Sequence, residues 1–284
     1  MKRSKIGYWL FLLPCLVAFL LVVVIPTISG FYYSLTDWNG VADESTFIGF
    51  YNFERIFTAD PGFWQSFGFT ALFALCAVIA INVVGFALAM LVTKRFRGAN
   101  FMRSVFFMPN LIGGLLLGFA WQFIFVNVFS ATGLPFLQGW LTNSTTGFLG
   151  LLILMTWQMG GYMMLIYIAA LQNIPDSVYE AASLDGAVGR KKLFGITLPM
   201  VAPSFTIGLF LTLSNCFKLY DQNLALTGGG PNNSTQMLAL NIYQTAYSSN
   251  NFGGAQAKAI IFFVSVALIA GLQLYFSKKR EVEL

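Results

Sequence analysis

The sequence predicts an all-α membrane protein with six transmembrane helices and one short cytoplasmic helix. Of its 284 residues, 57% are hydrophobic and 10% are charged, whereas soluble domains usually carry about 25% charged residues. Long apolar segments recur from one end of the chain to the other, and basic residues stand in short clusters beside them. Because no stretch is left for a separate globular unit, we expect one membrane domain over residues 1–284.

Six segments are long and apolar enough to cross the hydrocarbon core, which takes about 20 helical residues. They are expected at residues 8–30, 66–92, 104–127, 147–171, 197–216 and 257–277. The first continues to Gly30 without a small-residue cleavage site, so we interpret it as a span and not as a signal peptide. Pro199 and Pro203 stand near the start of the fifth span, and membrane helices tolerate proline where neighbours satisfy the freed carbonyls.

The positions of the basic residues predict the orientation of the chain. Most of the 16 Lys and Arg residues fall in four clusters: at the N-terminus, between the second and third spans, before the fifth span and after the sixth. These clusters share one side of the membrane if both termini are inside. Because basic flanks are retained in the cytoplasm, both termini are expected there. A nucleic-acid-binding surface would instead gather the basic residues on one folded face.

Residue types that membrane enzymes and ion-coupled carriers depend on are missing where they would act. Histidine is absent, Cys15, Cys76 and Cys216 lie inside apolar segments, and the sequence indicates no catalytic residue and no metal site. No expected span has a charged residue in its interior, which argues against proton- or sodium-coupled transport. The chain lacks the Gly-Lys dipeptide of a phosphate-binding loop, so ATP would have to bind another subunit.

A short polar segment between the fourth and fifth spans predicts a cytoplasmic helix. Pro175 and Asp176 are typical of a first helical turn, and Gly186 offers a stop. Four positions spaced at i, i+3, i+4 and i+7 form one narrow face that suits close docking to another protein: Val178, Ala181, Ala182 and Asp185. From this pattern alone, a connector resting on the membrane surface is equally compatible.

The spacing within residues 175–199 favours docking. The segment contains Glu180-Ala181-Ala182, followed after three residues by Gly186 and after nine more by Ile196-Thr197-Leu198-Pro199. This pattern resembles the EAA loop of permease subunits in binding-protein-dependent ABC importers. A second segment is similar to the outer region of carbohydrate-type permeases related to the maltose and glycerol phosphate importers. It comprises Lys218-Leu219-Tyr220-Asp221, Leu226-Thr227-Gly228-Gly229-Gly230-Pro231 and Phe252-Gly253. Some members of these families have extra N-terminal spans, and we expect only the six-span core here.

This resemblance implies the architecture of a type I ABC importer permease in a bacterial or archaeal cytoplasmic membrane. A coupling helix would dock into the ATPase through Glu180, Ala181, Ala182, Asp185 and Gly186. The chain would not be an enzyme and would carry no cofactor, because ATP and Mg would bind two separate ATPase subunits. Its other expected partners are a second permease, which completes a heterodimer, and an extracytoplasmic solute-binding protein.

A sugar path would need aromatic faces and polar groups inside or at the ends of the spans. The candidates are Trp121, Gln122, Trp157, Gln158, Tyr162, Asn215, Lys218, Tyr220 and Asp221. The rigid turn Gly228-Gly229-Gly230-Pro231 is expected to help dock the binding protein, although a plain surface turn has the same pattern. The small-residue pairs Gly114/Gly118 and Gly160/Gly161 are interpreted as helix-packing positions.

A neutral oligosaccharide is the expected substrate, because Lys218 is the one cation among the path candidates. An ABC permease for glycerol phosphate or a polyol, an ATP-independent facilitator and a multispan membrane enzyme are the alternatives. The EAA-like loop argues against a facilitator, which has no ATPase to dock. An enzyme would need a convergent acid/base set near one membrane face, and the sequence indicates none.

Overall fold

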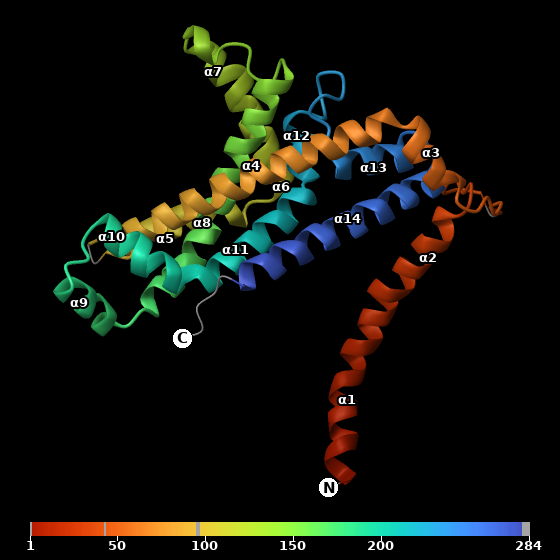
Figure 1. Ribbon diagram of the computed structural model, residues 1–284. Coiled ribbons are helices and arrows are strands. Elements are labelled where there is room, and N and C mark those ends of the chain that lie inside the picture. The colour runs from red at the N-terminus through yellow and green to blue at the C-terminus, as the bar shows by residue number, and fades with distance from the viewer. Residues whose placement is uncertain (1, 43, 95–96, 280–284) are drawn as a thin grey trace. The chain divides into compact units, whose positions relative to one another are not determined.

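The computed structural model describes residues 2–42, 44–94 and 97–279, with side chains from Gly7 onward. The secondary structure of this part consists of helices and one isolated β-bridge between Thr36 and Phe47 (Figure 1). Arg95 and Arg280, which entered the prediction of orientation, lie outside the described residues. The same holds for the basic side chains at positions 2, 3 and 5.

The helices follow one another with short connections, and three π-helical turns continue α-helices without a break. The α-helices are α1 (Lys2–Phe19), α2 (Ile25–Ser34), α3 (Tyr51–Ala59), α4 (Pro61–Val92), α5 (Ala99–Phe107), α6 (Gly114–Phe123), α7 (Phe129–Ala131), α8 (Ser144–Gln172), α9 (Asp176–Leu184), α10 (Arg190–Lys192), α11 (Leu198–Phe217), α12 (Asp221–Leu226), α13 (Leu238–Tyr247) and α14 (Phe252–Lys278). The π-helical turns are η1 (Leu20–Val24), η3 (Ile124–Val128) and η5 (Leu193–Thr197), and the 3₁₀ turns are η2 (Met108–Leu111) and η4 (Pro135–Leu137).

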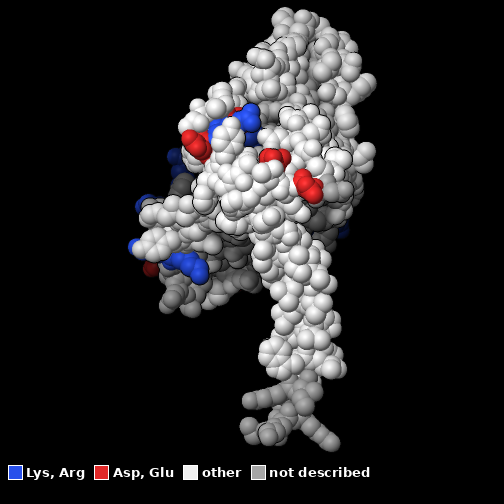
Figure 2. All heavy atoms as spheres, turned by 90° about the vertical axis from the view of Figure 1, so that its right-hand side faces the viewer, with Lys and Arg blue, Asp and Glu red and all other residues white. Residues whose placement is uncertain are grey.

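Six helical segments of the described chain are long and apolar enough to cross a membrane, in agreement with the predicted fold class. They are Gly7–Ser34, Pro61–Val92, Gly114–Ala131, Ser144–Gln172, Arg190–Phe217 and Phe252–Lys278. The first carries no acidic or basic residue, so the space-filling view of its described part is white along its length (Figure 2). Such a surface suits lipid or another apolar helix.

The third and fifth expected spans differ most from the structure at their starts. The third was expected to be continuous from residue 104, which is wrong, because residues 104–107 belong to α5 and the chain turns extended at Ile112 and Gly113 before α6. Pro109 explains the break, since it has no N–H for a helical hydrogen bond. The fifth span begins at Arg190, seven residues early, because the π-helical turn η5 joins α10 to α11 ahead of Pro199.

Contacts divide the chain into two compact units, one of residues 64–240 and 265–284, the other of residues 1–63 and 241–264. In the larger unit, α8 packs against α5, α6, α11 and α12. Buried polar side chains join three of its spans: Asn82 on α4 donates to Thr212 of α11 at 3.0 Å and accepts from the hydroxyl of Tyr167 on α8. A buried amide in hydrocarbon needs such partners, so this network fixes the contact between these spans.

The smaller unit is held together by an aromatic cluster and a buried cation. Trp38 stacks on Tyr33 with ring centroids 4.3 Å apart and contacts Phe252 at 5.5 Å. Lys258 forms an ion pair with Asp60, with Nζ 2.7 Å from Oδ2. The sequence placed Lys258 at the edge of the sixth span, but α14 begins at Phe252 and encloses it in its second turn. The N-terminal end of this span therefore contains a charge that has its own partner.

Candidate coupling helix and substrate path

The helix α9 begins and ends where the sequence indicates. Pro175 is the extended residue before it, and Asp176 places a carboxylate in its first turn, where negative charge favours the helix dipole. At the other end Ala187 N–H donates to the Ala182 carbonyl at 2.8 Å and Gly186 N–H donates to Ser183 at 3.2 Å. These two bonds define a Schellman motif, and Gly186 takes the required left-handed conformation with φ of 74°.

The expected docking face of α9 is divided in two by the structure. Ala182 is 5% exposed and faces its own chain, whereas Glu180, Ala181 and Asp185 are exposed. The predicted face that combined all four positions is therefore wrong, because the chain itself covers Ala182 and leaves Ala181 and Asp185 exposed. Sequence reasoning missed Leu184, a large apolar side chain that is 89% exposed. An apolar residue in a polar connector was the signal that could have identified it.

A cation over an aromatic ring connects α9 to the segment that follows it. The Nζ atom of Lys192 on α10 lies 4.0 Å from the ring centroid of Tyr179. Lys192 leads through η5 directly into α11. The contact therefore joins α9 to the segment that begins a membrane-length helix.

The structure brings four of the nine path candidates together on α6 and α8. The rings of Trp121 and Trp157 meet edge to face with centroids 5.5 Å apart, and Gln122 and Gln158 follow them in the chain. Trp157 is exposed and Trp121 half-buried. The pair therefore offers aromatic surface of the kind that stacks on sugar rings.

The two glutamines bond to backbone carbonyls at the break before α6 and at the end of α12. Gln158 is 8% exposed and donates to the Ile112 carbonyl, at the break before α6, at 3.3 Å. Its own oxygen accepts a 2.8 Å bond from Gln222 on α12. Gln122 donates to the Leu226 carbonyl at the end of α12 at 3.2 Å. Gln222, which the sequence analysis missed, completes a chain of amides from the break to α12.

Close backbone approach accounts for the small residues on α6. A Cβ on Gly118 would stand 2.5 Å from Cβ of Ala225, and one on Gly114 would stand 2.8 Å from Cβ of Asp221. The helix α12 therefore packs directly on this glycine face, which agrees with the packing interpretation. It also places the exposed Asp221 beside the start of α6.

Three of the remaining path candidates, Tyr162, Asn215 and Lys218, lie apart from this cluster. Within the described residues, no hydrogen bond or ring contact joins Tyr162, Asn215 or Lys218 to it. The Asn215 amide donates back to the Leu211 carbonyl of its own helix at 2.8 Å. Tyr220 precedes α12 directly and is half-buried.

The turn Gly228-Gly229-Gly230-Pro231 is held by a buried network that the sequence did not reveal. Asn223 donates to Thr227 at 3.0 Å and to the Thr235 carbonyl at 2.8 Å, and accepts from Met237 N–H at 2.9 Å. The Thr235 hydroxyl donates to the Gly230 carbonyl at 2.6 Å. Pro231 is exposed at the tip. The turn is thus a fixed projection and not a loose loop.

Comparisons with known proteins agree on one family. A family model described as "Binding-protein-dependent transport system inner membrane component" matches residues 81–282. The chain is 51% identical to a probable starch degradation products transport system permease protein, AmyD, of Thermoanaerobacterium thermosulfurigenes, over 99% of this chain and 97% of the relative. It is 32% identical to the multiple sugar-binding transport system permease protein MsmF of Streptococcus mutans, over 98% of each.

Solved structures agree on the fold. A bacterial ABC transporter that imports the acidic polysaccharide alginate contains a chain that matches with a TM-score of 0.83 at 19% identity, over 98% of this chain and 96% of that one. At this identity the match concerns the fold alone. It confirms the type I importer architecture predicted from the sequence.

Proposed function

Because the chain belongs to the family of inner membrane components of binding-protein-dependent transport systems, we propose that it lines the membrane path of an ATP-driven importer for a neutral oligosaccharide. The observation that carries this proposal is α9, a capped helix that exposes Glu180 and Leu184. Its Tyr179 contacts Lys192, which leads into α11. Residues 1–284 would act as one permease domain.

The relatives support the class of solute. The relative with 51% identity is named for starch degradation products and the one with 32% identity for multiple sugars. Fragments of starch are uncharged, and the joined aromatic and amide side chains of Trp121, Trp157 and Gln158 suit uncharged sugar rings. Lys218 lies apart from them, so a phosphate-bearing solute would meet no cation in the cluster.

The coupling role is assigned to the exposed part of α9. Glu180 would form the polar anchor in a cleft of the ATPase, Leu184 would fill an apolar pocket there, and Ala181 and Asp185 would line the contact. Ala182 supports α9 from within the chain and Gly186 closes it. Closure of two ATPase subunits around ATP and Mg would pull α9 and, through Lys192, tilt α11.

The other partners follow from the family and from the surface of the chain. A second permease would cover part of the exposed apolar surface and complete a heterodimer. An extracytoplasmic binding protein would dock at Gly228-Gly229-Gly230-Pro231 and deliver the sugar. Both termini would be cytoplasmic, as the basic clusters indicate, in a bacterial or archaeal cytoplasmic membrane.

Affinity purification of the tagged chain from its native membrane tests the coupling role. We expect an ATPase subunit and a second permease to be recovered with the wild type. Glu180→Ala and Leu184→Ser should each reduce recovery of the ATPase, while Glu54→Ala, an exposed glutamate on α3, should leave it unchanged. Recovery of the chain alone, with sugar flux intact in ATP-free vesicles, would identify a facilitator and refute the proposal.

Uptake by the reconstituted complex tests the substrate class. Vesicles that contain ATP, with the binding protein added outside, should accumulate a labelled linear glucose oligosaccharide. Excess glycerol phosphate should not compete. Competition by glycerol phosphate or a polyol, with no uptake of the oligosaccharide, would move the substrate to the alternative class while the importer assignment stands.

A further inference from the structure

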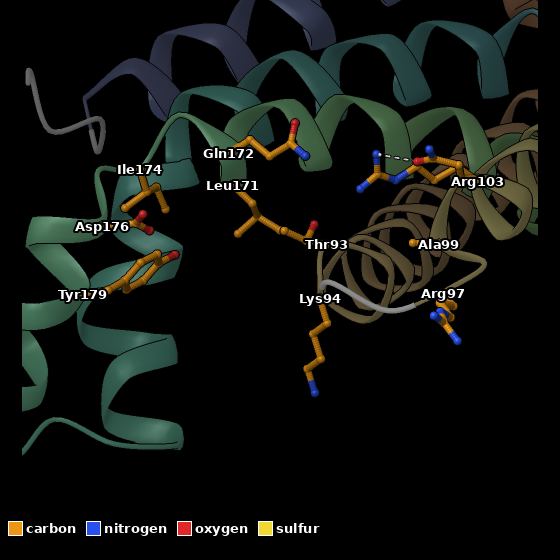
Figure 3. Close-up of a pocket in the computed structure, with 11 residues that line it drawn as sticks. Thr93, Lys94, Arg97, Ala99, Arg103, Leu171, Gln172, Ile174, Asp176 and Tyr179 are labelled. Atoms are coloured by element: carbon orange, nitrogen blue, oxygen red, sulfur yellow. Dashed lines mark hydrogen bonds between the residues drawn. The ribbon is translucent and has the colours of Figure 1, made fainter.

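A basic pocket lies between the ends of two spans and α9. It has a volume of about 720 Å³, and its walls come from the end of α4, the start of α5, the end of α8 and the first turn of α9 (Figure 3). Three cations line it, Lys94, Arg97 and Arg103, against one carboxylate, Asp176. The charged residues that line this space therefore favour an anion.

Two buried polar atoms on the wall of this pocket have no hydrogen-bond partner among the described residues. They are Nε of Arg103 and Oγ1 of Thr93. The other end of the Arg103 guanidinium is fixed, since Nη2 donates to the Val92 carbonyl at 3.2 Å and Nη1 to Asn100 at 3.5 Å. A buried donor without a partner is costly, and both of these atoms belong to residues that line the pocket.

An apolar pocket adjoins the basic one. Its volume is about 360 Å³, and it shares Thr93, Lys94, Leu171 and Tyr179 with its neighbour. Apolar side chains such as Met90 and Leu193 line the rest. A charged compartment continuous with an apolar one fits an amphiphile better than a small inorganic ion.

The depth of the pockets supports the same conclusion. The membrane-length helices α4 and α8 end at Val92 and Gln172, next to residues that line the basic pocket. The ends of spanning helices lie at the level of the lipid headgroups. Basic pockets between helices on the cytoplasmic side are suited to anionic lipid headgroups.

We propose that this pocket binds a phosphate-bearing anion, the headgroup of an anionic phospholipid, through Arg103, Arg97, Lys94 and Thr93. The apolar pocket would receive the adjoining part of the lipid. Because Asp176 and Tyr179 of α9 line the basic pocket, a bound headgroup would touch the coupling helix. That last consequence and the cytoplasmic position of the pocket both rest on the proposed function.

Native mass spectrometry of the purified full-length chain tests binding without any transport assay. Phosphatidylglycerol should be retained at least about fivefold better than phosphatidylcholine, because one cation near an anionic lipid contributes about 1 kcal/mol. Arg97→Gln and Lys94→Gln, both at exposed positions, should each reduce this retention about fivefold. Arg103→Gln should do so more strongly, while Arg55→Gln, an exposed arginine on α3, should leave retention unchanged.

Competition with inorganic phosphate distinguishes a lipid headgroup from a soluble phosphate as the anion bound in the pocket. Failure of equimolar phosphate to displace phosphatidylglycerol supports the lipid, whereas displacement from the wild type that Arg97→Gln weakens supports a soluble phosphate in the same pocket. Equal retention of both lipids, or retention unchanged in Arg97→Gln and Lys94→Gln, overturns the proposal. Loss of ATPase recovery in these variants with unchanged lipid retention would assign the pocket to a protein partner instead.

Discussion

Removing the carboxylate of Asp60 should destabilise the protein more than removing both members of its ion pair. Lys258 Nζ lies 2.7 Å from Asp60 Oδ2 and donates to Asn241 and Thr245 at 2.9 Å each. The side chains of Lys258 and Asp60 are 7% and 26% exposed. The cation is therefore the more buried partner, and it depends on the carboxylate for its charge balance.

The magnitude follows from this asymmetry. Breaking a fully buried pair by removing one partner costs about 3–5 kcal/mol, and the partial exposure of Asp60 lowers this to about 2–3 kcal/mol for Asp60→Asn. Lys258→Met leaves the more accessible carboxylate unpaired and should cost about 1–2 kcal/mol. The double variant has no unpaired charge and should lie within about 1 kcal/mol of the wild type.

A further substitution separates the ion pair from helix capping. Asp60 Oδ1 accepts the Phe63 N–H at 2.9 Å at the start of α4, and asparagine can replace aspartate in that role. Asp60→Ala should therefore be about 1 kcal/mol less stable than Asp60→Asn. The difference in stability between Asp60→Ala and Asp60→Asn measures the contribution of the helix cap at the start of α4.

Thermal unfolding of the wild type and the four variants in one detergent provides the assay. At roughly 2 °C for each kcal/mol in a chain of this size, Asp60→Asn should lower the melting temperature by about 4–6 °C, and adding Lys258→Met should restore most of it. Additive losses in the double variant would refute the reasoning, because independent effects mean that the charges are not coupled.

Three other substitutions test the coupling helix and the path. Gly186→Val should reduce ATPase recovery about 5- to 30-fold, because the left-handed conformation costs a residue with a Cβ about 1–2 kcal/mol. Gly186→Asn should retain recovery, since nothing lies within 4 Å of a Cβ there. An equal loss in both variants would show that the effect does not come from the backbone conformation. Gln158→Met should raise the KM of sugar uptake and cost about 1–3 kcal/mol of stability, with exposed Gln172→Met as the neutral control. Gly118→Val should lower the stability by about 1–3 kcal/mol by pushing α12 away from α6. Gly113→Ala is the control, because no atom lies within 4 Å of a Cβ there, and it should melt as the wild type does. Unaltered melting of Gly118→Val would argue against close packing of α12 on α6.

The helices were predictable because a membrane demands them locally. About 20 apolar residues suffice to predict a span, and Pro175, Asp176 and Gly186 set the limits of α9 by short-range bonds that any chain with these residues can form. The start of the third span was not predictable in the same way. A proline in an apolar segment can kink a helix or end it, and here the break after Pro109 is joined to α8 by Gln158, which bonds the carbonyl of Ile112, 46 positions away in the sequence.

Partners distant in sequence explain what the pattern of side chains could not. Lys258 stood at the expected edge of a span without an acidic neighbour, and its carboxylate is contributed by Asp60 at the start of another helix. Ala182 was assigned to an outward face because helical spacing groups it with Ala181 and Asp185. Spacing defines which residues share a side of a helix, but only the packing of α9 on its unit decides which side is covered.

The amides in the spans were predicted to contact the sugar, but an amide in a span can also join helices. An amide in hydrocarbon is costly without a use, and both Gln122 and Gln158 have one, but each donates to a backbone carbonyl at the end or break of a helix. One of the two N–H donors of each amide is therefore already used within the chain. The indole faces of Trp121 and Trp157 remain available beside them, so sugar contact falls first to the aromatic pair, and the glutamines hold α6, α8 and α12 in the positions that present it.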